Sequence, residues 1–261
     1  MLYNLFLHLS DTYSILNVFK FLTVRTGLAM FTSMLVVFLI GTPFIDYFSS
    51  HHIHDPIRED GPADHIVKKI GTPTMGGVLI LIGLFSGILL WGDLFNPYIW
   101  FLIFIVGSFG LLGAYDDYKK IKKKNSSGIS SKFKFLWQII LAIIGVLILI
   151  YFVDTPDLQK LYFPFFKNLI INLGWFFIPF YIFVIVGSSN AVNLTDGLDG
   201  LATVPVMLVA LSFTLISYVV GNIIFAEYLQ LQYIPDVGEI SIFCGSIVGS
   251  CLGFLWYNAP P

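Results

Sequence analysis

Residues 135–153 read FLWQIILAIIGVLILIYFV, a run of nineteen residues without a single Asp, Glu, Lys, Arg or His. About 20 apolar residues in a helix are needed to cross the hydrocarbon core of a bilayer. Only a helix or a closed barrel can satisfy the backbone polar groups of a spanning segment, because the hydrocarbon core offers no water. This stretch therefore predicts a transmembrane helix.

Six further stretches also lack ionisable residues: 27–45, 75–92, 98–114, 175–190, 201–220 and 240–256. Only 11% of the 261 residues are charged and 57% are hydrophobic, whereas soluble domains average about 25% charged residues. We therefore expect an all-α polytopic membrane protein with seven spans. Residues 1–261 are interpreted as a single integral membrane domain.

The basic residues predict the orientation of the chain in the membrane. Ten of the 14 Lys and Arg residues lie in two loops, 46–74 and 115–134. Loops rich in Lys and Arg stay in the cytoplasm. This puts the N-terminus outside and the C-terminus in the cytoplasm, and it puts the loop 188–200 on the same side as the two basic loops.

Residues 1–22 form an aromatic-rich segment that we expect at the outer membrane interface. They lack the basic start and the cleavage site of a signal peptide.

Cys244 and Cys251 lie seven residues apart in the last span, which is about 10 Å of helical rise. That separation is too long for a disulfide, so both cysteines are expected to be packing residues.

Carboxylates gather where the spans end. Asp116 and Asp117 directly follow the third span. Adjacent helical residues point about 100° apart, so we expect one aspartate to bind a metal while the other orients it or contacts substrate. Acidic groups are disfavoured at a helix C-terminus by the dipole, and a divalent cation would offset this cost. Oxygen ligands beside phosphates suit Mg²⁺. The alternative is a polar anchor at the membrane edge.

The loop 188–200 contains a second polar series. Asn193, Asp196 and Asp199 follow i, i+3 spacing, which puts them on one face if the stretch is helical. Gly197 and Gly200 would allow a ligand to approach the backbone closely. The alternative is a polar turn between two spans.

The basic and glycine-rich segments are the third candidate for chemistry. Thr72 or Thr74 could cap the helix that follows, and a helix N-terminus beside Lys69 is a natural anion site. The alternative there is an ordinary capped helix start. We interpret 119–124, which holds five lysines, as a positive-inside anchor, and expect Lys132 and Lys134 within reach of a phosphate. His51, His52 and His54 are more typical of a solvated loop than of a metal site.

Together these loops resemble the prokaryotic polyprenyl-phosphate N-acetylhexosamine-1-phosphate transferases, from roughly residue 23 onward. The segment 58–77 resembles the branch of that family whose donor carries N-acetylmuramic acid rather than N-acetylglucosamine. The motifs that carry the resemblance are Arg58…Asp60-Gly61-Pro62…His65…Lys69…Gly71-Thr72-Pro73-Thr74-Met75-Gly76-Gly77, Gly113-Ala114-Tyr115-Asp116-Asp117-Tyr118, Lys134-Phe135-Leu136-Trp137-Gln138 and Asn190-Ala191-Val192-Asn193-Leu194-Thr195-Asp196-Gly197-Leu198-Asp199-Gly200-Leu201-Ala202.

The resemblance implies a reaction and its partners. It implies transfer of phospho-MurNAc-pentapeptide from its UDP carrier to undecaprenyl phosphate, yielding lipid I and UMP in the first membrane step of peptidoglycan synthesis. It also implies Mg²⁺ as cofactor, the bacterial inner membrane as location and a cytoplasmic active site. Membrane lipid surrounds the chain, a homodimer is an open expectation, and no nucleic acid partner is expected.

The same resemblance implies roles for individual residues. Asp116, Asp117, Asn193 and Asp196 would form the catalytic cluster, with Asp116 and Asp117 near the metal. The residues implied in substrate binding are Lys69, Thr74, Lys134, Asn190, Gly197, Leu198 and Asp199. Gly197, Leu198 and Asp199 would hold the uracil.

Two departures from the family pattern leave alternatives open. The family has ten spans, and its further metal-binding Asp motif and His cluster would lie beyond residue 261. An inactive fragment is therefore one alternative. The spacing from His65 to Gly71 is one residue longer than usual, so Lys68 competes with Lys69 for the same role. A transferase that uses UDP-GlcNAc is the second alternative. A transporter is disfavoured, because no ionisable residue lies within a span.

Overall fold

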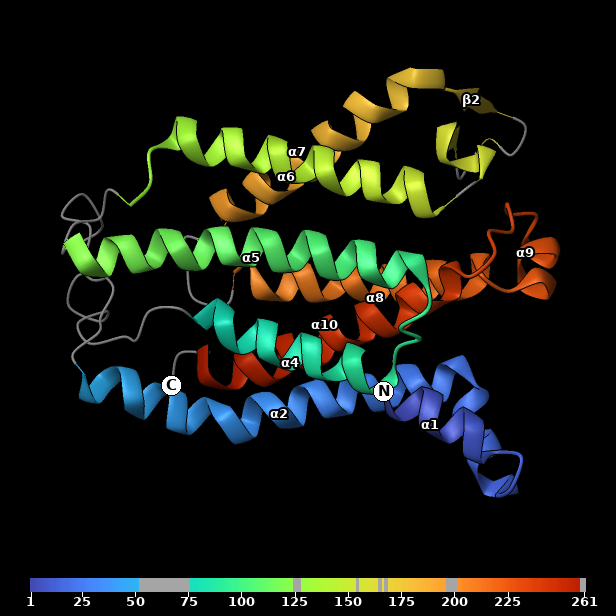
Figure 1. Cartoon of the computed structure of the whole chain (residues 1–261), viewed down its shortest axis with the longest axis horizontal. Coiled ribbons are helices and arrows are strands. Elements are labelled where there is room, and N and C mark those ends of the chain that lie inside the picture. Colours follow the sequence, from blue (N-terminus) through green and yellow to red (C-terminus); the bar gives the residue numbers. More distant parts are fainter. Residues whose placement is uncertain are drawn as a thin grey trace.

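The computed structural model describes residues 1–51, 76–123, 128–153, 155–163, 166, 169–195 and 201–258. These residues are mostly helical, with one short antiparallel hairpin and connecting turns (Figure 1). The elements are α1 (Leu2–Leu9), η1 (Ser14–Lys20), α2 (Leu22–Ser50), α4 (Gly76–Trp91), α5 (Pro97–Lys123), α6 (Ser131–Phe152), η2 (Pro156–Gln159), β1 (Lys160–Tyr162), β2 (Ile170–Asn172), η3 (Gly174–Phe176), α7 (Phe177–Thr195), α8 (Thr203–Val220), α9 (Ile223–Leu229), η4 (Val237–Glu239) and α10 (Ile240–Asn258).

The prediction of an all-α polytopic membrane fold is confirmed. Six of the helices are long and apolar enough to cross a membrane, and α4 is a shorter apolar helix of 16 residues within the described part of the chain. Each predicted span corresponds to one of these seven helices. Which end faces the cytoplasm stays a prediction, as do the boundaries of the three cytoplasmic loops.

The helix of the third span does not end where we expected. Asp116 and Asp117 were expected at its C-terminus, just after Ala114, but α5 continues to Lys123. Apolarity ends where the membrane ends, whereas a helix continues as long as its residues favour helical backbone, and lysines do so. Asp116 and Asp117 therefore lie inside the helix and not after it.

Helix α10 is the centre of the structure and packs against α2, α4 and α8 (Figure 1). Three glycines one turn apart, Gly245, Gly249 and Gly253, face α2. A Cβ atom on Gly249 would overlap the backbone carbonyl of Met30. Small residues let helix backbones approach closely in membranes, where the hydrophobic effect does not drive helices together. This close approach makes α10 the most buried of the six spanning helices.

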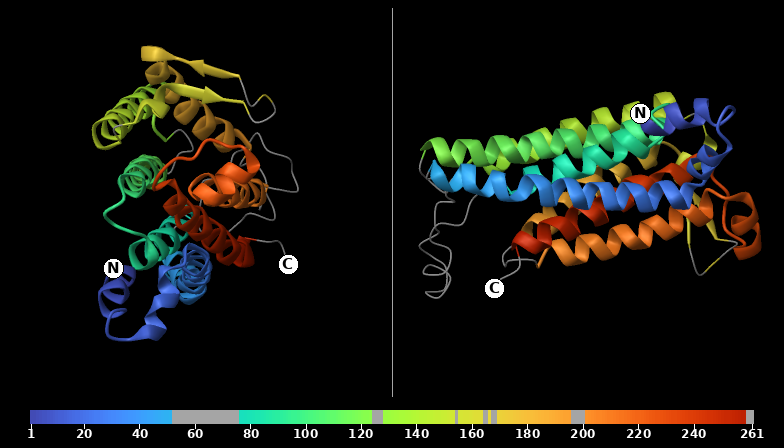
Figure 2. Two further views of the ribbon diagram at one scale, coloured as in Figure 1. Left: turned by 90° about the vertical axis from the view of Figure 1, so that its right-hand side faces the viewer. Right: turned by 90° about the horizontal axis from the view of Figure 1, so that it is seen from below.

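A second group of helices is formed by α5, α6 and α7. Helix α6 packs against both α5 and α7, and the hairpin β1–β2 connects α6 to α7 (Figure 2). Gly145 of α6 receives Ile105 of α5, because any Cβ at Gly145 would overlap the Ile105 side chain. Pro179 lies in the first turn of α7, where a missing backbone N–H costs nothing. The second group meets the first mainly through α4 and α5.

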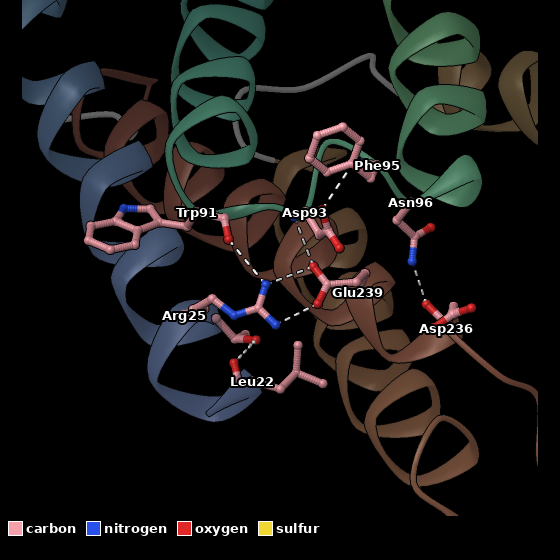
Figure 3. A network of polar contacts seen from close by, with 9 residues as sticks. Leu22, Arg25, Trp91, Asp93, Phe95, Asn96, Asp236 and Glu239 are labelled. Carbon is pink, nitrogen blue, oxygen red and sulfur yellow. Dashed lines mark hydrogen bonds and ion pairs between the residues drawn. The ribbon is translucent and has the colours of Figure 1, made fainter. Parts of the chain in front are cut away.

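A buried ion pair joins three helices at one end of the first group (Figure 3). Arg25 of α2 donates two hydrogen bonds to the carboxylate of Glu239, at 2.5 and 2.9 Å. The same carboxylate accepts the backbone N–H of Asp93 at 3.0 Å, and Arg25 also donates to the carbonyl of Trp91 at the end of α4. Arg25 is only 4% exposed. The network fixes the ends of α2, α4 and α10 relative to one another.

The N-terminal segment packs over this network. The ring of Tyr3 lies 3.8 Å from the Arg25 guanidinium carbon. Phe6 of α1 stacks on Phe19 of η1 with ring centroids 4.5 Å apart, and Phe19 stacks on Trp91. The expected interfacial location of residues 1–22 stays a prediction.

Cys244 and Cys251 are both free and buried, as expected of packing residues.

We predict that Gly249→Ala destabilises the protein. The added methyl group collides with the Met30 backbone, and overpacking of this kind costs about 1–3 kcal/mol. The matched control is Gly187→Ala on α7, where nothing lies within 4 Å of the added methyl group. Thermal unfolding in detergent should show a lower midpoint for Gly249→Ala only. Equal midpoints for both variants would contradict the close approach of α10 to α2.

We also predict that Glu239→Gln is strongly destabilising. Removing one partner of a buried ion pair leaves an uncompensated charge, at a cost of about 3–5 kcal/mol. The double variant Arg25→Met/Glu239→Met should recover much of the loss, because it removes both charges. Thermal unfolding of the single and double variants checks this. A double variant no more stable than Glu239→Gln would argue against an uncompensated charge as the cause.

Candidate functional site

The carboxylate of Asp116 is buried at the junction between α5 and the start of α6. One oxygen, Oδ1, accepts the backbone N–H of Ile129 at 2.6 Å. The other, Oδ2, lies 2.8 Å from Nζ of Lys120, one turn further along α5. Asp116 therefore holds the chain entering α6 against the end of α5. Both of its oxygens already have partners within the protein.

Gly128 makes this hydrogen bond to Ile129 sterically accessible. Its φ is +39°, in the left-handed region that favours glycine. A Cβ at this position would overlap Oδ1 of Asp116 and approach Cε of Lys120 to 2.9 Å. The local sequence therefore needs glycine immediately before Ile129, so that the backbone can pass close to the Asp116 carboxylate.

Asp117 has a different environment from its neighbour. It lines a cavity of about 610 Å³ between α4, α5 and α7, whose other described walls are apolar residues, glycines and serines. Asp117 is the one ionisable residue among the described residues that line this cavity. Its side chain is 35% exposed, against 12% for Asp116. The two aspartates thus differ in burial, but contrary to the expectation from adjacent helical positions both carboxylates reach one point, the Nζ of Lys120.

Lys120 connects the two aspartates. Its Nζ lies 2.8 Å from Oδ2 of Asp116 and 3.2 Å from Oδ1 of Asp117. Sequence reasoning missed this role, because it treated 119–124 as one basic anchor. The available signal was spacing: Lys120 follows Asp117 by three residues and Asp116 by four, and both spacings put side chains on one helical face.

Asn190 of α7 is tied to α6 by a side-chain hydrogen bond. Its amide nitrogen donates to Oε1 of Gln138 at 2.8 Å and to the carbonyl of Val186 at 2.8 Å. Gln138 is 3% exposed, so this bond lies inside the protein. Lys134 is one turn before Gln138 on α6, is partly exposed, and is close enough to Asp116 to interact with it electrostatically. The structure thus brings Lys134 and Asp116 together, while Asn190 binds the same face of α6.

Asn193 lies on α7 three residues after Asn190 and is exposed. The remaining predicted site residues lie outside the described residues; these are Lys69, Thr74, Asp196, Gly197, Leu198 and Asp199. His52 and His54 also lie outside them. Within the described part of the chain, no group of three or more His, Cys, Asp and Glu side chains is arranged to hold a metal ion. His51 is bonded locally, with Nδ1 at 2.8 Å from the carbonyl of Tyr47.

Comparison with known proteins identifies relatives along the whole chain. Residues 98–261 match the model for glycosyl transferase family 4, and residues 69–81 match signature 1 of phospho-N-acetylmuramoyl-pentapeptide-transferase. A phospho-N-acetylmuramoyl-pentapeptide-transferase of Pelagibacter ubique is 72% identical over 261 residues, which are 100% of this chain and 72% of that protein.

Two other relatives carry the same name. One from Rickettsia bellii is 52% identical over 262 residues, covering 100% of this chain and 72% of the relative. One from Caulobacter vibrioides is 52% identical over 252 residues, covering 94% of this chain and 68% of the relative. The chain thus spans roughly 70% of the length of these relatives.

We predict that Gly128→Ala disrupts the junction between α5 and α6. The change combines an unfavourable positive φ, costing about 1–2 kcal/mol, with a collision against Asp116. Gly174→Ala is the matched control, because Gly174 has φ +50° but nothing within 4 Å of the added methyl group. Thermal unfolding should show a larger loss for Gly128→Ala than for Gly174→Ala. Equal losses would mean that φ alone explains the effect and that the Asp116 contact contributes nothing.

Proposed function

The chain belongs to the phospho-N-acetylmuramoyl-pentapeptide-transferase family, and we propose on that basis that it transfers phospho-MurNAc-pentapeptide from UDP to undecaprenyl phosphate. The products are lipid I and UMP. The observation that carries the proposal is the 72% identity to a relative of that name over all 261 residues. The match of residues 69–81 to the transferase signature supports the same donor.

The proposed location follows from the substrates and from the distribution of charge. Seven apolar helices make the chain a multi-pass membrane protein. We propose the bacterial inner membrane, with the ends of α5 and α7 that carry Asp117 and Asn193 facing the cytoplasm. The basic loops near these ends support this orientation. A soluble nucleotide-linked donor and a membrane-bound lipid acceptor would meet at this surface.

The cavity at Asp117 supports an amphiphilic substrate. Its walls are mostly apolar side chains of α4, α5 and α7, and its ionisable group is a carboxylate bonded to Lys120. An apolar lipid chain would be accepted along the walls, with its phosphate near Asp117 and Lys120. Lys134, which interacts electrostatically with Asp116, adds positive charge for a second phosphate group.

The residues at this site fit a magnesium ion. Mg²⁺ is bound in proteins through one or two carboxylates together with substrate phosphates. Asp117 would hold it, since one of its oxygens bonds Lys120 and the other has no bond to a described protein group. Both oxygens of Asp116 are occupied by Ile129 and Lys120, so Asp116 would act by positioning. When bound, the ion would offset the charge of the diphosphate.

The reaction proposed is a displacement at the phosphorus of the sugar phosphate. An oxygen of the lipid phosphate forms the new P–O bond as the bond to the UMP oxygen breaks, and UMP leaves with the electron pair. A phosphate monoester has a second pKa near 6, so much of the acceptor is ionised without help from the protein. The main tasks of the protein are therefore to position the two phosphates and to reduce their repulsion, which Lys120 and Lys134 can do.

Lipid I synthesis tests the proposal directly. The assay uses membranes with labelled UDP-MurNAc-pentapeptide, undecaprenyl phosphate and Mg²⁺. It compares the P. ubique relative with a chimera in which these 261 residues replace the matched part of that relative. We expect both proteins to form lipid I. If the chimera forms product with UDP-GlcNAc and none with UDP-MurNAc-pentapeptide, the donor assignment is wrong.

Within the active chimera, we expect Asp117→Asn and Lys120→Met to lower the rate of lipid I formation by about 10²-fold or more. Removing one preorganised electrostatic partner of a reacting oxyanion typically costs about 10²–10³-fold. Lys122→Met is the matched control, because Lys122 is exposed and lies on the same end of α5. Near-normal rates for both site variants would exclude this pair from the active site.

A further inference from the structure

The two edges of the hairpin between α6 and α7 differ: the β1 edge, called the polar side, carries Lys160 and Tyr162, and the β2 edge, called the apolar side, carries Ile170 and Ile171 and continues to Phe176. The hairpin consists of β1 and β2 (Figure 2), with Leu161 paired to Ile171 and Tyr162 paired to Ile170. The residues of β1 are half-buried, whereas all three residues of β2 are exposed. It lies where α6 ends and α7 begins, at the opposite end of α7 from Asn193. The proposed transferase site makes no use of it.

The polar side is satisfied within the hairpin itself. The carboxylate of Asp157 accepts hydrogen bonds from Lys160 Nζ and from the Tyr162 hydroxyl, both at 2.9 Å. The hydrogen bond from Lys160 is the main reason that the pKa of Asp157 lies below its ordinary value. Burial, with the bond to Asp157, raises the pKa of Tyr162 to about 12. Asp157 therefore stays ionised and Tyr162 stays protonated across the neutral range, and the three side chains form a closed cluster.

A bond to α7 fixes the hairpin in place. The hydroxyl of Tyr181 on α7 donates to the carbonyl of Leu158 at 2.8 Å. Together with the pairing of Leu173 N–H to the Gln159 carbonyl at 2.8 Å, this bond holds the hairpin against the first turns of α7. The apolar side is thus presented in a defined position.

The apolar side is large and uncharged. Residues 169–176 contain no ionisable side chain. Trp175 is 81% exposed, Phe176 63%, Ile170 49% and Ile171 42%. In water, an exposed apolar edge strand is a site of aggregation, and natural proteins protect such edges with charges. The absence of charge from this edge indicates that water is not its environment.

We propose that Ile170, Ile171, Trp175 and Phe176 form an anchor that inserts into the boundary between lipid headgroups and acyl chains. The two adjoining spans also carry exposed apolar side chains, Tyr151 at the end of α6 and Phe183 on α7. Helix α6 has 22 residues, or about 33 Å, so its end lies at the bilayer surface. Tryptophan concentrates at this level of membrane proteins, because its ring is apolar and its N–H is polar.

The test measures how deeply two anchor positions lie in a bilayer. Single variants Ile171→Cys and Trp175→Cys are spin-labelled in liposomes, and collision rates with oxygen and with a water-soluble nickel complex are compared. Oxygen concentrates in the acyl region and the nickel complex in water. Phe183→Cys serves as the reference within the hydrocarbon, and Lys122→Cys, exposed near the end of α5 and beyond its apolar part, as the reference in water. The chain without added cysteines reports any labelling of the buried Cys244 and Cys251.

We expect both anchor positions to show an oxygen-to-nickel ratio well above that of Lys122→Cys and approaching that of Phe183→Cys. A ratio equal to that of Lys122→Cys would mean that the hairpin lies in water. Low collision rates with both reagents would mean that protein covers the surface. Either of these two results overturns the proposal. The readout does not depend on transferase activity, so it remains valid whether or not the proposed function holds.

Discussion

The structure depends on how closely α10 can approach its neighbours. In a bilayer, apolar surface gains little by leaving lipid for protein, so helices associate through close packing and polar bonds. Gly245, Gly249 and Gly253 provide that packing on the α2 side of α10. On α4, Gly87 lies against the hydroxyls of Ser33 and Ser246, where no Cβ would fit. Helices α2, α4 and α10 are thereby held at short distances from one another, and the Arg25–Glu239 pair fixes one end of this group.

The second group of helices is assembled differently, and the difference bears on the site. Helices α5, α6 and α7 meet through fewer close contacts, and they leave a cavity of about 610 Å³ beside α4. Specific polar bonds hold these helices together at the end that carries the aspartates. Asp116 joins α5 to the start of α6, and Asn190 joins α7 to Gln138 of α6. An open cavity bounded by defined polar junctions is a suitable arrangement for binding a large substrate at the membrane surface.

The sequence predicted the fold well, because membrane insertion imposes a simple pattern. The seven stretches without ionisable residues all correspond to helices, since hydrocarbon penalises both bare charges and unsatisfied backbone. Helix ends were harder to predict: Lys119–Lys123 continue α5 after its apolar part has ended. Arg25 shows a second limit of prediction from sequence. It lies just before the apolar stretch 27–45, yet it is buried inside α2. Its burial depends on pairing with Glu239, which lies 214 residues further along the chain.

The site was partly predictable for a related reason. The motifs located Asp116 and Asp117 and implied that they would have different roles, but the assignment of those roles depends on contacts between segments. Asp116 is bound by a backbone N–H that follows α5 in the chain, and only the fold brings Gly128 and Ile129 back to it. Lys120 was hidden by its neighbours, because one lysine among several resembles a general anchor.

The contacts of Lys120 also explain why two adjacent aspartates are useful there. Lys120 is held by the buried Asp116, whose other oxygen accepts the backbone N–H of Ile129, so Lys120 keeps its position if Asp117 turns toward a ligand as we propose. In that proposal Asp116 fixes the position of the positive charge, and Asp117 binds metal or substrate from the cavity. The burial of Asp116, the exposure of Asp117 and the shared lysine are three parts of one arrangement.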